Sequence, residues 1–341
     1  MAEILPFRGL LYNTERVDGR DVTAPPYDII TPAYREELYR KNPYNIVRID
    51  FGKELPGDDE ENNKYKRASE FLERWIKDGV LVRDEKVGFY LYEAIYTHRG
   101  RKKSMLGFIG ALKLEPLGEG SVYPHEMTRS KPKEDRLNIM RYCMCNTSPI
   151  FGLYSSKENI LEGLFKRARK NRCLIESIDL DGGIHRLWAI HDEEGINTIK
   201  DFMKDKEIFI ADGHHRYETA LEFRDEMRRM KKSGEHPEPF DYVMMFLTNM
   251  DEGGFTLLPT HRIVEGVNHI FNTLNRRFPL KPIESIPEND PLTYLLSHME
   301  GKKHIVGVYI REGNFYGFLS LKDAEPVGVP NVLRDLDVTR L

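Results

Sequence analysis

One segment in the middle of the chain constrains its fold more than any other, and it covers residues 208–221. Its first four residues, Ile-Phe-Ile-Ala, are apolar and are typical of a short buried strand. Tyr217 and Ala220 then recur at helical spacing. The segment therefore predicts a strand, a tight turn at Asp212 and Gly213, and a helix.

The start of that helix has the chemistry of an anion site. The backbone N–H groups of a first helical turn lack partners within the helix, and the helix dipole favours negative charge there. Gly213 would let a ligand approach the backbone without a Cβ in the way. His214, His215 and Arg216 add donors that suit phosphate oxygens. We therefore expect phosphate to bind at Gly213, His214, His215 and Arg216.

Asp212 places an acid beside this expected anion, which is unfavourable unless the acid holds Mg²⁺, acts as a base or caps the helix. Two other interpretations stay open. The histidines could form a polar surface cluster, or Asp212, His214 and His215 could hold the metal of a hydrolase. Adjacent histidines usually point apart, whereas paired ligands on a helix stand four residues apart. The spacing therefore favours the phosphate interpretation over a zinc site.

A second acidic element precedes this segment in the chain. A phosphate-binding turn without an acidic partner would lack both a base and a metal ligand. His125 and Glu126 follow a predicted strand end after Pro124, where functional loops occur. Glu126 is thus a candidate base beside Asp212, and the alternative is an ordinary exposed carboxylate.

Charged residues at a second predicted helix start, Ser130-Lys131-Pro132, could support the site. Arg136 could clamp a carboxylate or a phosphate, and Asp135 could hold Arg136 in place. Lys133 would add a further cation. The alternative is a solvated helix face.

Two further loops carry candidate residues. Asp28 follows Pro25-Pro26-Tyr27, and the prolines would hold it rigidly at a pocket or in a packed loop. His261 and Arg262 follow a buried strand and a proline. They could present a second cationic pair or form a structural corner.

Composition limits the classes of protein and of partner. The 341 residues are 40% hydrophobic, which is enough for a buried core and about two domains. The sequence contains no apolar run of about 18 residues, so no membrane span is expected. The 51 basic and 55 acidic residues give a net charge of −4, so a nucleic-acid partner is not expected. Three cysteines without paired spacing favour neither a zinc knuckle nor a disulfide framework, and a cytoplasmic location is expected.

The pattern of elements predicts an α+β fold with mixed sheets, hairpins and packed helices. Two β-rich runs, 87–97 and 104–114, flank Gly100 and predict a hairpin. Apolar residues between Tyr65 and Ile76 share one helical face.

Residues 1–60 lack such periodicity and are expected to be irregular. Residues 24–32 predict a fixed, extended loop because they are rich in proline, and residues 42–49 predict a loop that enters a short strand. We expect an N-terminal α+β region over 1–120 and a second region over 121–341, which together form one intertwined unit.

Nearly the whole chain resembles a prokaryotic family known as domain of unknown function 1015, whose signature matches residues 208–221. Further segments carry the same resemblance. They are Pro25-Pro26-Tyr27-Asp28, Asn42-Pro43-Tyr44-Asn45-Ile46-Val47-Arg48, Pro124-His125-Glu126, Lys133 with Asp135-Arg136, Ser148-Pro149-Ile150-Phe151 and Leu258-Pro259-Thr260-His261-Arg262.

The shorter string from Asp212 to Arg216 is similar to a turn in free-serine kinases of the ParB/sulfiredoxin-like superfamily. In those proteins the turn holds the donor phosphates at a helix N-terminus, and the phosphoryl group passes to the hydroxyl of free L-serine. Sulfiredoxins carry Gly-Cys-His-Arg in the same role. This chain has His214 in place of that cysteine, so sulfiredoxin chemistry is not implied.

The resemblance implies a ParB/sulfiredoxin-like nucleotide-binding core and a small-molecule kinase. Its donor would be ATP or ADP with Mg²⁺, for which Asp212 is a possible ligand, and its acceptor would be L-serine or a similar small hydroxyl metabolite. The catalytic residues would be Glu126, Asp212 and His214, with Glu126 or Asp212 as the base. A nucleotide-binding regulator without turnover is the alternative.

Overall fold

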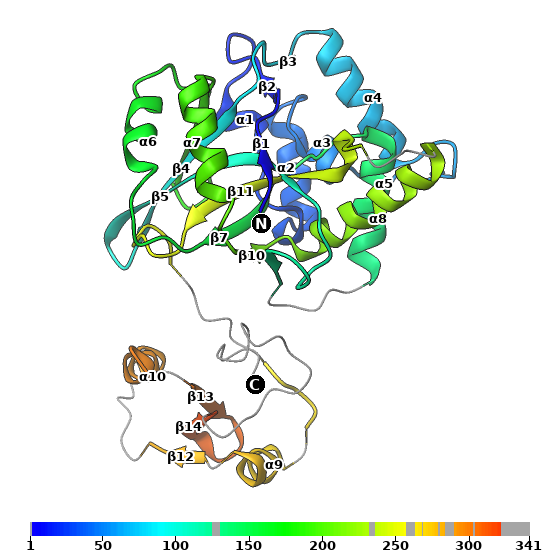
Figure 1. Cartoon of the computed structure of the whole chain (residues 1–341). Coiled ribbons are helices and arrows are strands. Elements are labelled where there is room, and N and C mark those ends of the chain that lie inside the picture. The colour runs from blue at the N-terminus through cyan, green and yellow to red at the C-terminus, as the bar shows by residue number, and fades with distance from the viewer. Residues whose placement is uncertain are drawn as a thin grey trace. The chain divides into compact units, whose positions relative to one another are not determined.

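The computed structural model describes residues 2–124, 130–231, 236–256, 263–267, 269–278, 280–283, 290–302 and 304–321. The chain divides into two compact units, Met1–Thr256 and Leu257–Leu341 (Figure 1). The first unit combines mixed sheets with packed helices, which confirms the predicted α+β class.

A mixed sheet of nine described strands forms the centre of the first unit. Its order is β6 (Val122–Tyr123), β10 (Ile208–Asp212), β7 (Ile150–Tyr154), β11 (Tyr242–Asn249), β5 (Arg101–Lys113), β4 (Phe89–His98), β9 (Ile184–Ile190) and β8 (Ile175–Ile178), and β1 (Ile4–Leu5) pairs with β5. The pairs β6–β10 and β7–β11 are parallel, and the other pairs are antiparallel. A separate small sheet pairs β2 (Leu10–Tyr12) with β3 (Leu81–Arg83).

The helices of the first unit fall into groups. The described helices are α1 (Gly19–Val22), α2 (Pro32–Lys41), α3 (Val47–Asp50), α4 (Lys64–Lys77), α5 (Ser130–Cys143), α6 (Glu162–Ala168), α7 (Glu193–Met203) and α8 (His214–Lys231), with the 3-10 turns η1 (Tyr27–Ile29) and η2 (Pro239–Asp241). α8 packs against α5, α5 against α4, and α4 against α3 (Figure 1). α6 and α7 lie together elsewhere on the sheet.

The main core lies around the central sheet. Phe89, Phe108 and Ile210 from the strands are fully buried there, together with Tyr217 from α8. A second apolar cluster surrounds Trp75 of α4 and includes Ile139 of α5. α5 therefore stands between the sheet-bound α8 and the cluster around α4.

The second unit has its own small sheet, in the order β12 (Leu280–Pro282), β14 (Phe315–Ser320) and β13 (Ile305–Ile310). Its described helices are α9 (Ile270–Arg277) and α10 (Pro291–Met299), and the 3-10 turn η3 (Glu312–Asn314) joins β13 to β14.

Several local predictions are confirmed. β4 and β5 form the expected hairpin, and Gly100 in its turn has φ +72°. α4 begins after its N-cap Asn63, whose side chain accepts from two backbone N–H groups, and ends at Lys77 with Asp78 as its C-cap. These elements follow from signals within a few residues.

The prediction that residues 1–60 are irregular was wrong, because α1, α2 and α3 lie within them. Pro32 is the first residue of α2 and Thr31 caps that helix, so the proline-rich run ends in a helix. The strand expected within 42–49 is the short helix α3. Asn45 determines this, because its side chain accepts from the Val47 N–H at 3.1 Å and donates to two backbone carbonyls of the α1 region.

Residue 120, the expected division between two regions, lies inside the first unit, and β5 and β6 on either side of it belong to the same sheet.

Candidate functional site

The strand–turn–helix predicted from residues 208–221 is confirmed. β10 ends at Asp212 and α8 begins at His214, so Gly213 alone connects them. Gly213 has φ +93°, in the left-handed region that favours glycine. A Cβ built on it would lie 2.9 Å from Nε and 3.0 Å from Nη2 of Arg216. The backbone angle therefore favours glycine here, and a Cβ would in addition displace the end of the Arg216 side chain.

Arg216 ties this turn to the loop that precedes β7. Its Nη2 donates to Oδ2 of Asp212 at 2.5 Å, and its Nη1 donates to the Pro149 carbonyl at 2.5 Å and to the Ser148 hydroxyl at 3.2 Å. The side chain of Arg216 is 15% exposed and that of Asp212 is 50% exposed. Asp212 is thus the last residue of the strand with its charge compensated by arginine, and Gly213 holds the N-cap position of α8.

The sheet brings other chain segments to the same edge. β7 runs antiparallel to β10, with Phe151 opposite Asp212, so the start of β7 lies beside the turn. β6 runs parallel to β10, and the rings of Tyr123 and Phe209 stack at 5.5 Å. The chain therefore leaves β6 at the end of the sheet where the turn lies. His125 and Glu126 lie outside the described residues, and their approach to the turn stays a prediction.

The first turns of α8 are anchored in the core. His214 is buried, with 4% of its surface exposed, whereas His215 is half-buried. Tyr217 is fully buried, and its hydroxyl donates to the Glu115 carbonyl at 3.0 Å. Burial raises the pKa of Tyr217 to about 12, so the hydroxyl stays a donor at neutral pH. The N-terminus of α8 is therefore held firmly against the sheet.

Lys133 connects α5 with α8. Its ammonium group forms an ion pair with the Glu218 carboxylate, and its backbone carbonyl accepts from the Thr219 hydroxyl at 3.4 Å. Lys133 therefore helps to set the spacing between the two helices.

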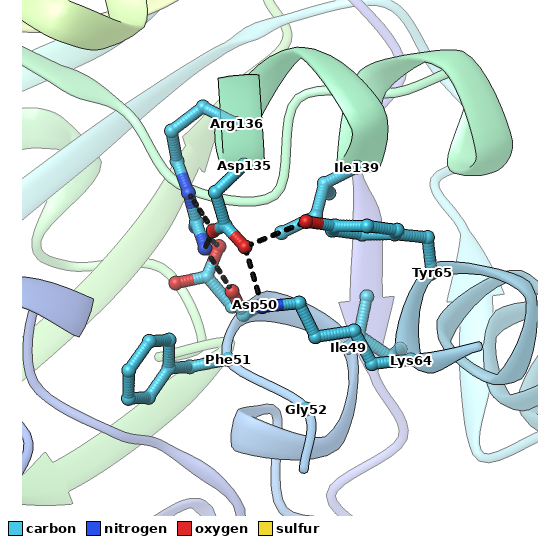
Figure 2. A pocket seen from close by; sticks show the side chains of 9 residues that line it. All are labelled: Ile49, Asp50, Phe51, Gly52, Lys64, Tyr65, Asp135, Arg136 and Ile139. Carbon is cyan, nitrogen blue, oxygen red and sulfur yellow. Dashed lines mark hydrogen bonds and ion pairs between the residues drawn. The ribbon is translucent and has the colours of Figure 1, made fainter. Parts of the chain in front are cut away.

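Arg136 is buried at the junction of α3 and α5, where Figure 2 shows it beside Asp50 and Asp135. Its Nη1 donates to Oδ1 of Asp50 at 3.1 Å, and its Nη2 donates to the Asp50 carbonyl at 2.7 Å and to Oδ2 of Asp135 at 2.6 Å. Its Nε donates to the same Asp135 oxygen at 3.2 Å. The guanidinium also lies over the Tyr27 ring, 4.0 Å from the centroid. Asp135 thus holds Arg136 in the way its sequence position suggested.

Asp135 has further partners on α4. Lys64 Nζ lies 2.7 Å from its Oδ1, and the Tyr65 hydroxyl donates to the same oxygen at 3.0 Å (Figure 2). Burial alone would raise the pKa of the Asp135 carboxyl, but Arg136 and Lys64 outweigh it and hold that pKa below its usual value. Asp135 is therefore ionised at neutral pH.

Two hollows border Arg136. The first lies among α3, α4 and α5, and its lining is drawn in Figure 2. The second lies between α5, α8 and the start of β7. Its lining residues are Arg136, Ile139, Met140, Cys145, Asn146, Thr147, Ser148, Ile150, Arg216, Thr219 and Val243. The second hollow thus contains both arginines and includes no carboxylate among its described lining residues.

The other predicted site residues are not placed at the turn or at either hollow by the described part of the chain. Asp28 is exposed on η1, although the ring of its neighbour Tyr27 packs on Arg136. His261 and Arg262 lie outside the described residues.

Sequence reasoning missed several residues of this region as site residues. Thr147 and Ser148 belong to a polar run that ends in a proline before a strand, and this loop signal could have identified them. Asp50, which accepts from Thr147 at 2.5 Å, gave no such signal because it stands in a four-residue helix.

The described residues lack two further kinds of feature. They contain no group of three or more His, Cys, Asp or Glu side chains placed to hold a metal ion. They also contain no helix with the length and apolarity that crossing a membrane requires.

Comparison with known proteins gives one match. The family model for a protein of unknown function, DUF1015, matches residues 4–339. Neither the curated proteins nor the solved structures include a match to this chain. Because the family model covers almost the entire length, the chain belongs to the DUF1015 family.

Proposed function

We propose that this protein is a nucleotide-dependent phosphotransferase that phosphorylates the hydroxyl of free L-serine or of a similar small metabolite. ATP or ADP with Mg²⁺ would be the donor. The similarity of the turn to that of free-serine kinases supports this proposal, and it implies that β10 and α8 belong to a ParB/sulfiredoxin-like nucleotide-binding core.

The observation that carries the proposal is the conformation of Gly213. A glycine with φ +93° joins a buried strand directly to a helix, with the guanidinium of Arg216 folded against it. The N–H groups of a first helical turn and a fixed guanidinium together suit a phosphate group, because both donate to its oxygens and offset its charge. This arrangement favours a phosphate ligand over other anions that lack several acceptor oxygens.

The residues around the turn suit the remaining roles. Asp212 is half-exposed at the mouth of the turn, which fits a ligand of Mg²⁺, an ion that usually binds one or two carboxylates together with substrate phosphates. When bound, Mg²⁺ would neutralise charge on the transferred phosphoryl group. His215 is half-buried and would donate to phosphate more readily than the buried His214.

The transfer breaks the bond between the terminal phosphorus and its bridging oxygen and forms a bond from the serine hydroxyl oxygen to phosphorus. The hydroxyl proton passes to Glu126 or to Asp212, and the shortened nucleotide leaves. Asp212 would need to release Arg216 to act as the base, whereas Glu126 follows β6, which ends beside β10.

Incubation with L-serine, Mg²⁺ and either ATP or ADP, followed by phosphorus NMR, tests the proposal. We expect a phosphomonoester signal from O-phosphoserine. Arg216→Lys removes the planar fork and should lower turnover at least about ten-fold. Arg229→Lys is the matched control, because Arg229 is exposed on the same helix.

Nucleotide binding without any phosphorylated product would instead identify a non-catalytic regulator. A protein that neither binds nucleotide nor forms product would refute the proposal altogether.

A further inference from the structure

We propose that the hollow between Arg136 and Arg216 binds the carboxylate of the acceptor, so that the substrates are small hydroxy acids or hydroxy amino acids. This inference rests on the proposed function and specifies the acceptor class for it. The turn from Asp212 to Arg216, called here the phosphate turn, gives by itself no reason for the acceptor to be an acid and not a simple alcohol.

Two helices and a loop build most of the hollow, and β7 and β11 add Ile150 and Val243. α5 contributes Arg136, Ile139 and Met140, which stand three and four residues apart and therefore share one face of the helix. α8 contributes Arg216 and Thr219, again three residues apart. The loop before β7 closes the hollow with residues 145–148.

The hollow offers guanidinium donors to an anion. Its described lining contains two guanidinium groups and no carboxylate, because Asp50, Asp135 and Asp212 pair with the arginines from outside that lining. A guanidinium has five N–H donors. Arg136 donates four hydrogen bonds to described residues, and Arg216 donates three. Both arginines therefore keep donor capacity for a ligand carboxylate.

The neutral lining suits the rest of such a ligand. Asn146, Thr147 and Ser148 are half-buried and carry oxygens that can accept from an ammonium or hydroxyl group. Ile139, Met140, Ile150 and Val243 provide an apolar wall for a short carbon chain.

Arg216 belongs both to this hollow and to the phosphate turn. A carboxylate held here would therefore keep the acceptor hydroxyl in the neighbourhood of the donor phosphates, as transfer requires.

The test compares L-serine with L-serinamide, which keeps the hydroxyl and the amine but lacks the carboxylate. Titration calorimetry is run on the full chain with Mg²⁺, both without nucleotide and with a non-hydrolysable ATP analogue. We expect L-serine to bind at least about ten-fold more tightly, as for the loss of a charge-assisted hydrogen bond. Equal affinities, or no binding of either compound under both conditions, would overturn the inference.

Variants locate the binding. Arg136→Gln should weaken L-serine binding at least about ten-fold, whereas Arg141→Gln removes the same charge from an exposed position on α5 and should leave it unchanged. Ser148→Ala removes a half-buried hydroxyl of the lining and should weaken binding several-fold, which decides the matter if Arg136→Gln fails to fold. Unchanged affinity in every folded variant of the hollow would contradict the proposal.

The outcomes separate this inference from the kinase function. Carboxylate-dependent binding without O-phosphoserine formation would support the hollow and refute the kinase. Equal phosphorylation of L-serine and L-serinamide would support the kinase and refute the hollow.

Discussion

Gly213→Ala tests the central turn most directly. Gly213 combines φ +93° with a guanidinium at 2.9–3.1 Å from the position of a Cβ. An alanine must therefore adopt a strained backbone angle and displace the side chain of Arg216. The second effect also breaks the contact between Arg216 and Asp212 that fixes the guanidinium at the turn.

The two effects differ in size. A non-glycine residue in the left-handed region costs about 1–2 kcal/mol. The Arg216–Asp212 pair adds only about 0–1 kcal/mol, because the carboxylate is 50% exposed and solvent screens it. Lost hydrogen bonds from Arg216 to Pro149 and Ser148 add about 1 kcal/mol. We expect a total loss of about 2–4 kcal/mol, or a Tm lower by roughly 4–16 °C.

Thermal unfolding with and without ATP and Mg²⁺ measures both stability and binding. Gly100→Ala is the matched control, because Gly100 has φ +72° and no atom of the described residues lies within 4 Å of a Cβ there. Gly100→Ala should lose only the stability that the strained backbone angle costs, about 1–2 kcal/mol. It should keep the full rise in Tm that nucleotide causes. Gly213→Ala should lose more stability and most of that rise. Equal destabilisation by the two variants would show that displacing the Arg216 side chain costs no stability. If Gly213→Ala kept the full nucleotide-induced rise in Tm, nucleotide would have to bind elsewhere.

Four further substitutions probe the surroundings of the turn. Asp135 has a depressed pKa in the folded chain, so its stabilisation is present above the unfolded pKa of about 3.9 and is lost as pH falls through the folded value. Urea unfolding from pH 6 to pH 3 should therefore show a flatter acid decline for Asp135→Asn than for the wild type. Thr147→Val removes a donor to the buried Asp50 carboxylate and should cost about 1–3 kcal/mol in urea unfolding, and no loss would refute a stabilising bond. Glu126→Gln and Asp212→Asn separate the two candidate bases, since the variant of the true base should lose at least about a hundred-fold in kcat while still binding nucleotide.

The fold could be predicted where the determining residues are close together in the chain. α4 carries its N-cap at Asn63 and its stop at Asp78, and the β4–β5 hairpin carries Gly100 in its turn. α3 could not be predicted, because its β-branched residues favour a strand and the bonds of Asn45 to the α1 region override that preference. α2 had a usable signal in Thr31-Pro32, but its weak apolar periodicity concealed it.

In the candidate site, too, the relations between residues close in the chain could be predicted and the contacts between distant segments could not. Gly213 and Arg216 lie three residues apart, and a single strand–helix junction sets their relation. The partners of Arg216 at Ser148 and Pro149 depend instead on the pairing of β7 with β10. Arg136 and Asp50 lie 86 residues apart, and only the packing of α3 and α5 brings them together. No local pattern contains that information.

The two arginines differ in how easily they exchange partners. Arg136 is buried between two carboxylates, and breaking such a pair leaves an uncompensated charge at a cost of about 3–5 kcal/mol. Arg216 pairs with a half-exposed carboxylate, whose loss costs about 0–1 kcal/mol. An incoming phosphate could therefore replace Asp212 at Arg216 with little penalty, while Arg136 keeps its position. In the proposed reaction Arg216 is the residue that responds to the nucleotide, and Arg136 is the fixed reference against which the acceptor is held.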